Sequence, residues 1–284
     1  MASSLSANQR VAVVTGSSSG IGYEISLMLA RNGFLTYATM RNLNKSENIK
    51  SVASKENLPI RINQLDVTDD VSVKDAVQAI LSETGRIDVL VNNAGYVLSG
   101  AFEDLAMDEI KSEYETNVFG LIRTTQAVLP IMREQKSGII VNISSGNGRI
   151  GFPVASAYVS TKFAVEGLSE SMSYELEPFG IKVVLVEPMF IRTNVVNAMV
   201  VAKKSQDPNS SYSQIMQKMA TSLEHMKENW SSPDLVAKVV LKAVASENPS
   251  LRYLVGKDIE TWMEAKRSMS DEDFYNMMKQ NFMK

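Results

Sequence analysis

The chain has 284 residues, of which 44% are hydrophobic and 21% are charged, as is usual for a globular protein. The net charge of −3 is too small to favour a nucleic-acid partner, and without cysteine the chain forms no disulfide and no cysteine-based metal site. No apolar run reaches the ~18 residues of a membrane helix, and the N-terminal residues do not resemble a signal peptide. We therefore expect a cytoplasmic protein without membrane insertion.

Seven short runs rich in Val, Ile and Leu alternate with segments of helical periodicity. The expected strands are Val11–Thr15, Phe34–Thr39, Arg61–Asp66, Val89–Asn92, Ile139–Ser144, Lys182–Glu187 and Arg252–Val255. The expected helices between them are Ile21–Arg31, Val71–Glu83, Ile110–Arg133, Ala157–Glu177 and Pro233–Ser246. Near-continuous apolar runs are typical of strands covered on both faces. The pattern predicts a doubly wound α/β fold with a seven-stranded parallel sheet and helices on both faces.

Two regions interrupt this alternation. Residues from about 190 to 230 hold a polar stretch and a helical segment, and such a long connection is usually a lid or a linker. Residues from about 258 onward favour one or two helices rich in Met and aromatic side chains. Because the run Arg252–Val255 follows the long connection, we expect residues 1–284 to form a single domain with a lid-like insertion and a C-terminal helical extension.

A glycine-rich turn, Thr15–Gly22, follows the first expected strand and opens the first expected helix. Glycines let the backbone approach a pyrophosphate, and the helix N-terminus offers free N–H groups and the positive end of its dipole. The spacing is GxxxGxG, and a glycine cluster alone also suits an ordinary turn. The turn residues expected at a dinucleotide are Gly16, Ser18, Ser19, Gly20, Ile21 and Gly22.

Three further motifs follow in order. Asn92-Asn93-Ala94-Gly95 ends the fourth expected strand, Ser145 ends the fifth, and Tyr158-x-x-x-Lys162 opens the next helix. With the glycine-rich turn, these motifs resemble the short-chain dehydrogenase/reductase family over roughly residues 8–256. The resemblance implies a Rossmann fold and hydride transfer between a nicotinamide cofactor and a small-molecule carbonyl or alcohol. It also implies a homodimer or homotetramer.

The chemistry of Tyr158 and Lys162 suits this reaction. Hydride transfer to a carbonyl leaves an alkoxide that needs a proton, and the reverse reaction needs a base. Lys162 lies one helical turn from Tyr158, so its charge is expected to lower the phenol pKa from about 10. By itself, such a pair is more often a solvated surface pair. The resemblance assigns Ser145, rather than Ser144, to the substrate oxygen and Asn117 to a water of a proton relay.

The end of the second expected strand bears on cofactor choice. The resemblance puts Met40 where NAD-specific members carry Asp, and Arg41 where many NADP-preferring members carry a base. A guanidinium suits a 2′-phosphate, so NADP(H) is expected and NAD(H) is less favoured. Ser19 departs from the pattern, because some NADP-preferring relatives carry a second base there. The other cofactor residues that the resemblance implies are Asp66, Val67, Asn93, Ala94, Gly95, Tyr158, Lys162, Pro188, Ile191 and Thr193.

The substrate pocket expected from the resemblance is apolar. It draws on Tyr96, Val97, Leu98, Ile150, Phe152, Val154, Met189 and Phe190. A steroid-, retinoid- or acyl-like substrate fits, and the pattern looks most like the hydroxysteroid and retinol dehydrogenase branch. A 3-oxoacyl reductase and a catalytically silent NADP(H)-binding regulatory protein are the alternatives. His225 is the only histidine and lacks neighbouring ligands, so no metal site is expected.

Overall fold

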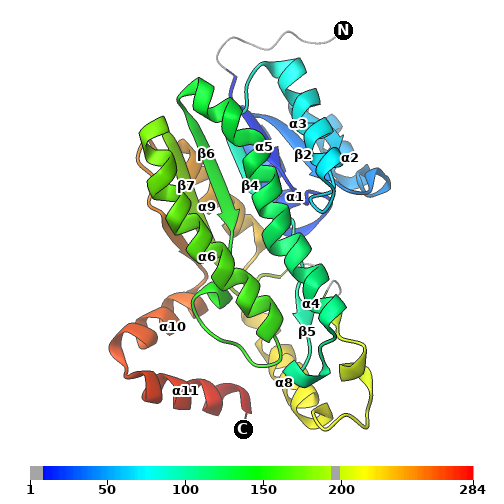
Figure 1. Cartoon of the computed structure of the whole chain (residues 1–284), viewed down its shortest axis with the longest axis vertical. Coiled ribbons are helices and arrows are strands. Elements are labelled where there is room, and N and C mark those ends of the chain that lie inside the picture. Colours follow the sequence, from blue (N-terminus) through cyan, green and yellow to red (C-terminus); the bar gives the residue numbers. More distant parts are fainter. Residues whose placement is uncertain (1–8, 193–198, 284) are drawn as a thin grey trace.

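The computed structural model describes residues 9–192 and 199–283. Its main sheet has seven parallel strands in the order β3-β2-β1-β4-β6-β7-β9 (Figure 1). The strands are β1 (Val11–Val14), β2 (Leu35–Met40), β3 (Ile60–Gln64), β4 (Val89–Asn92), β6 (Gly138–Ile143), β7 (Ile181–Pro188) and β9 (Arg252–Val255). Each lies within about two residues of the run that predicted it. The predicted fold class is confirmed.

Helices cover both faces of this sheet. On one face lie α1 (Gly20–Arg31), α2 (Glu47–Lys55) and α9 (Pro233–Ala245), and on the other lie α3 (Asp70–Thr84), α5 (Gly120–Gln135) and α6 (Ser156–Leu176). Alternate residues of β1 enter the two cores: Ala12 and Val14 pack toward α1 and α9, and Val11 and Val13 pack toward α3 and α5. Burial on both faces explains why the strands read as continuous apolar runs.

The strand order reverses between β1 and β4. The chain first proceeds outward through β2 and β3, and then returns to the other side of β1 to build β4, β6, β7 and β9. In open parallel sheets, ligands bind at such a reversal, beside the carboxyl ends of the strands. The glycine-rich turn and the residues after β4, β6 and β7 are therefore brought to one edge of the sheet.

Three local features differ from the sequence expectation. The helix expected over 110–133 is α4 (Met107–Tyr114), a π-helical turn (Glu115–Phe119) and α5. The helix α2 was not expected, because it is only nine residues long, is mostly polar and has Ile49 as its one buried residue. A small parallel sheet pairs β5 (Leu98–Ser99) with β8 (Val200–Val201), and strands of two residues carry no readable pattern.

The long connection after β7 begins and ends at the main sheet. Ser231 N donates to Phe190 O (3.0 Å) and Arg192 N donates to Ser231 O (2.7 Å), which joins its two ends. Within the connection lies α8 (Ser213–Met226), and after β9 come α10 (Lys257–Ser268) and α11 (Asp271–Met283). These three helices lie at the same end of the molecule (Figure 1).

The helices α8, α10 and α11 share one apolar cluster with the loops after β6 and β7. Its buried members are Ile150, Met189, Met219, Ile259, Met263, Met278 and Phe282. Aromatic rings pack edge to face in and around it, with Phe152 and Phe282 ring centres 4.7 Å apart and Phe190 and Trp262 ring centres 5.6 Å apart. None of the helices in the described residues is both long and apolar enough to cross a membrane.

Candidate functional site

A cleft of about 1390 Å³ lies along the carboxyl ends of β1, β4, β6 and β7. A pocket for one small ligand usually measures about 300–1,000 Å³, so this cleft has room for a dinucleotide together with a substrate. Most of the predicted site residues line it: Gly16, Ser18, Ser19, Gly20, Ile21, Arg41, Asp66, Val67, Asn93, Ala94, Gly95, Ser145, Tyr158, Lys162, Pro188 and Ile191. Gly22 and Asn117 lie behind its wall, and Thr193 falls outside the described residues.

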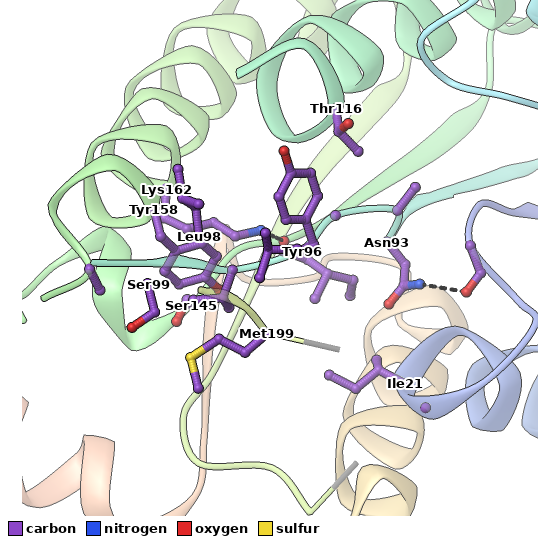
Figure 2. Close-up of a pocket in the computed structure, with 18 of the residues that line it drawn as sticks. Ile21, Asn93, Tyr96, Leu98, Ser99, Thr116, Ser145, Tyr158, Lys162 and Met199 are labelled. Atoms are coloured by element: carbon purple, nitrogen blue, oxygen red, sulfur yellow. Dashed lines mark hydrogen bonds between the residues drawn. The ribbon is translucent and has the colours of Figure 1, made fainter. Parts of the chain in front are cut away.

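The glycine-rich turn forms one end of the cleft. Gly16 and Gly20 have φ angles of 68° and 62°, a region that favours glycine. A Cβ on Gly22 would lie 2.4 Å from Asn93 Nδ2 and 2.5 Å from Gly16 O. The Asn93 amide instead donates to Thr15 O (2.9 Å) and Gly16 O (3.2 Å), which fixes the turn against the end of β4 (Figure 2).

This turn fits a pyrophosphate. Ser19 precedes α1 but makes no side-chain capping bond, so the first N–H groups of α1 are open to the cleft. Such N–H groups and the helix dipole attract an anion. The backbone here comes so close to its neighbours that a side chain at Gly22 would displace Asn93 and the backbone of Gly16, which shape the cradle.

The end of β2 forms a cationic corner of the same cleft. Met40 is buried, whereas the exposed side chains of Arg41 and Lys45 line the cleft. Within residues 9–192 and 199–283, neither cation pairs with an acid. Sequence reasoning did not consider Lys45, although it follows Arg41 by four residues. Asp66 bonds within its own turn, accepting from Thr68 N (3.0 Å) and Thr68 Oγ1 (2.8 Å).

Ser145, Tyr158 and Lys162 meet near the middle of the cleft (Figure 2). Tyr158 and Lys162 come from the first turns of α6 and Ser145 from the loop after β6. The Lys162 Nζ donates to Ile143 O (2.8 Å) and lies 5.7 Å from the centre of the Tyr158 ring. Ser145 Oγ accepts from Asn147 N (3.1 Å) and keeps its own proton for donation to a group in the cleft.

Burial dominates the ionisation of this group. It raises the pKa of Tyr158 to about 12, although a hydrogen bond with Ser145 acts in the opposite direction. It lowers the pKa of Lys162 to about 8, opposed by the negative charges of Glu113 and Glu166. The expected lowering of the phenol pKa by Lys162 is therefore wrong for the free protein, because desolvation of the phenolate outweighs it. Tyr158 is a protonated acid at neutral pH.

Asn117 supports the site from behind. It lies on the π-helical turn and is 2% exposed. Its Nδ2 donates to Tyr96 O (2.9 Å) and Thr161 Oγ1 (3.3 Å), and its Oδ1 accepts from Tyr96 N (3.0 Å). These bonds join the loop after β4 to α6, next to Lys162. A π turn interrupts the helical hydrogen-bond ladder and often marks a functional site.

The other end of the cleft is mainly apolar. Of the expected substrate residues, the cleft lining includes Tyr96, Val97, Leu98, Phe152, Val154, Met189 and Phe190. Ile150 was expected there but is 1% exposed and packs in the cluster beneath. Met199, Val200, Lys203 and Leu223 bring the long connection to this wall. Val154 (φ 52°) and Phe190 (φ 48°) both hold a left-handed backbone conformation that such side chains rarely adopt.

A family model described as short chain dehydrogenase matches residues 10–204. The chain is 36% identical to a 3-ketodihydrosphingosine reductase of Bacteroides thetaiotaomicron, over 91% of this chain and 92% of the relative. It is 34% identical to human 17-beta-hydroxysteroid dehydrogenase type 1, over 86% and 76%.

Two solved structures superpose on this fold over most of both chains. A short-chain dehydrogenase from Streptomyces avermitilis superposes with a TM-score of 0.80 at 33% identity, covering 92% of this chain and 93% of the other. A structure described as ElxO with NADP bound superposes with a TM-score of 0.74 at 29% identity, covering 89% and 99%.

Proposed function

The chain belongs to the short-chain dehydrogenase/reductase family of oxidoreductases, as its motifs predicted, and from that premise we propose a specific activity. The protein is an NADP(H)-dependent enzyme that transfers a hydride between the nicotinamide and a carbonyl or alcohol of an apolar small molecule. One observation carries this proposal. Ser145, Tyr158 and Lys162 meet in a cleft that continues without interruption to the glycine-rich turn and Arg41.

The residues of the chain have separate tasks in this reaction. Bound NADP(H) supplies or accepts the hydride. The Tyr158 hydroxyl gives its proton to the oxygen of the reduced carbonyl, and Ser145 Oγ donates a hydrogen bond to the same oxygen. Lys162 holds a positive charge close to Tyr158 and stabilises the phenolate that remains. In the free protein the pKa of Tyr158 is raised to about 12 by burial, so the phenol carries the proton that this step requires.

Two observations support NADP(H) over NAD(H). Met40 is buried at the position from which an acidic side chain would repel a 2′-phosphate, and Arg41 and Lys45 line the adjacent corner. A guanidinium and an ammonium together match the charge of that phosphate. A related chain, described as ElxO with NADP bound, shares the fold.

The apolar end of the cleft supports a lipid-like or steroid-like substrate. Phe152, Phe190 and Met189 line it, and the long connection adds Met199, Val200, Lys203 and Leu223. A single domain with a lid-like insertion and a C-terminal helical extension stands as a proposal. Two relatives bear names that refer to such substrates: one is a 3-ketodihydrosphingosine reductase and the other a 17-beta-hydroxysteroid dehydrogenase. The homodimer or homotetramer and the cytoplasmic location also stand as proposals.

Replacement of Tyr158 by Phe tests the activity directly. We expect turnover to fall by about a hundredfold or more, because the ring remains but the transferable proton is lost. NADPH binding, followed by its fluorescence, should change little. Tyr174→Phe is the matched control, since that ring is 69% exposed on the same helix.

The substrates for this test are steroids, retinoids, acyl thioesters and small aldehydes, each offered with NADPH. Undiminished turnover in Tyr158→Phe would remove Tyr158 from the mechanism. NADPH binding by the wild-type protein without turnover of any of these carbonyls would favour the regulatory alternative.

A further inference from the structure

Glu113 is a buried carboxylate that the proposed mechanism does not use. It lies on α4, is 0% exposed, and accepts a hydrogen bond from Leu98 N (2.7 Å) through Oε1. In the described part of the chain, no donor reaches its other oxygen, Oε2, which is also buried. A buried carboxylate with one unpaired oxygen is costly, so its presence calls for a physical explanation.

The position of Glu113 connects it to the reacting groups. It precedes Asn117 by one helical turn, and both side chains bond to the loop after β4: Glu113 to Leu98, and Asn117 to Tyr96. The helix α4 packs directly on α6, where Tyr114 Oη donates to Ser160 Oγ (2.9 Å). Glu113 thus lies between the loop after β4 and the first turns of α6, which carry Tyr158 and Lys162.

Lys162 is the cation whose charge acts on this carboxylate. Glu113 raises the pKa of Lys162, and Lys162 in turn opposes the effect of burial, which raises the pKa of Glu113 to about 7. The other titratable groups nearby are Tyr158 on α6, Tyr96 before β5 and Glu109 on α4, which bonds to Lys203 N. Glu166 faces Lys162 from the next turn of α6 and bonds to Arg252. The π-helical turn contributes Glu115, which pairs with Arg123.

We propose that Glu113 is a positioning residue of the active site: its buried carboxylate lies between the substrate loop, to which it is tied by the bond to Leu98 N, and the first turns of α6, which carry Tyr158 and Lys162. This inference rests on the proposed function for its catalytic meaning. The charge relation between Glu113 and Lys162 can be measured without turnover.

The sign of the effect follows from electrostatics. Burial already favours loss of the Lys162 proton, and the carboxylate opposes that loss. Replacing Glu113 by Gln removes the charge but retains an oxygen that accepts from Leu98 N. The first proton should then leave the Tyr158–Lys162 pair at lower pH, because no negative charge remains to hold it, and a shift of about one pH unit is expected.

The experiment measures the pH midpoint at which Lys162 becomes reactive, by competitive acetylation with acetic anhydride and peptide mass spectrometry. The wild-type midpoint is expected near the Lys162 pKa of about 8. In Glu113→Gln it should fall by about one unit, a tenfold change in the proton affinity of the site. The alkaline limb of the NADPH-dependent reduction profile should move in the same direction by the same amount.

Two further variants separate charge from structure. Glu113→Asp keeps the charge but is too short to accept from Leu98 N, so the Lys162 midpoint should stay close to wild type while KM for the carbonyl rises. Glu134→Gln removes one charge from the exposed end of α5 and should change neither. Circular dichroism checks that each variant is folded.

Equal Lys162 midpoints in wild type and Glu113→Gln would overturn the proposal, whatever the activity. A shifted midpoint together with full turnover in Tyr158→Phe would instead keep the charge relation and reject the proposed function. The two failures are therefore distinguishable.

Discussion

The two ends of the cleft are built by different means. At the cofactor end, backbone atoms form the surface, and a few glycines allow strands, turn and helix to approach closely. At the substrate end, side chains form the surface, and they come from segments that are far apart in the sequence. Backbone surfaces depend on local conformation and tolerate little change, whereas side-chain surfaces depend on packing and can be altered one residue at a time.

The largest expected effect would break the cofactor end. In Gly22→Ala, the new Cβ would meet Asn93 Nδ2 and Gly16 O, so the turn must open. We expect the free energy of unfolding to fall by about 1–3 kcal/mol, as for other overpacked sites. NADPH affinity should fall about tenfold or more, measured by fluorescence titration. Gly167→Ala is the control, because a Cβ there meets nothing within 4 Å; similar behaviour of the two variants would contradict the close-packing argument.

A smaller effect would sharpen the role of the cationic corner. Arg41→Ala leaves the turn intact but removes the guanidinium proposed to bind a 2′-phosphate, and at an exposed side chain such a charge-assisted hydrogen bond contributes about 1.5 kcal/mol. The dissociation constant for NADPH should therefore rise about tenfold, while that for NADH changes about twofold or less. Arg133→Ala, at the exposed end of α5, should leave both constants unchanged. If NADPH and NADH weaken equally, Arg41 does not select the cofactor.

The smallest effect concerns the substrate end. Val154 holds a φ of 52°, which costs a β-branched residue about 1 kcal/mol or more. Val154→Gly should relieve that strain and Val154→Ala should not, although both remove the side chain. We expect the glycine variant to be more stable than the alanine variant by about 1 kcal/mol in urea unfolding. The usual order, with alanine more stable, would show that this backbone is unstrained.

The same contrast explains what could be predicted from the sequence. The seven strands could be predicted because strands buried on both faces consist of continuous apolar residues, as in Val11–Val14. The glycine-rich turn and the Tyr158–Lys162 pair were placed because their spacing is short and local. In contrast, β5 and β8 were missed, because two-residue strands are specified by distant partners rather than by their own pattern.

Residues that act through burial were harder to anticipate. In the sequence, Glu113 is one of several acidic residues in a charged helix. Its burial results from the packing of α4 on α6. The pKa of Tyr158 was expected to be lowered by Lys162, but a sequence does not reveal how completely a phenol is desolvated. Ile150 was expected at the pocket surface but lies in the apolar cluster, because its burial depends on the packing of distant helices that the sequence does not reveal.

The joined ends of the long connection have an evolutionary consequence. Because Phe190, Arg192 and Ser231 close it with backbone bonds at the sheet, its two ends are held in place whatever length of chain lies between them. Extra length in such a closed loop adds little entropic penalty. Residues 199–226 can therefore change in length and sequence wherever they do not pack on β5, α10 or α11, so that descendants of one scaffold acquire new specificities while inheriting the same reaction chemistry.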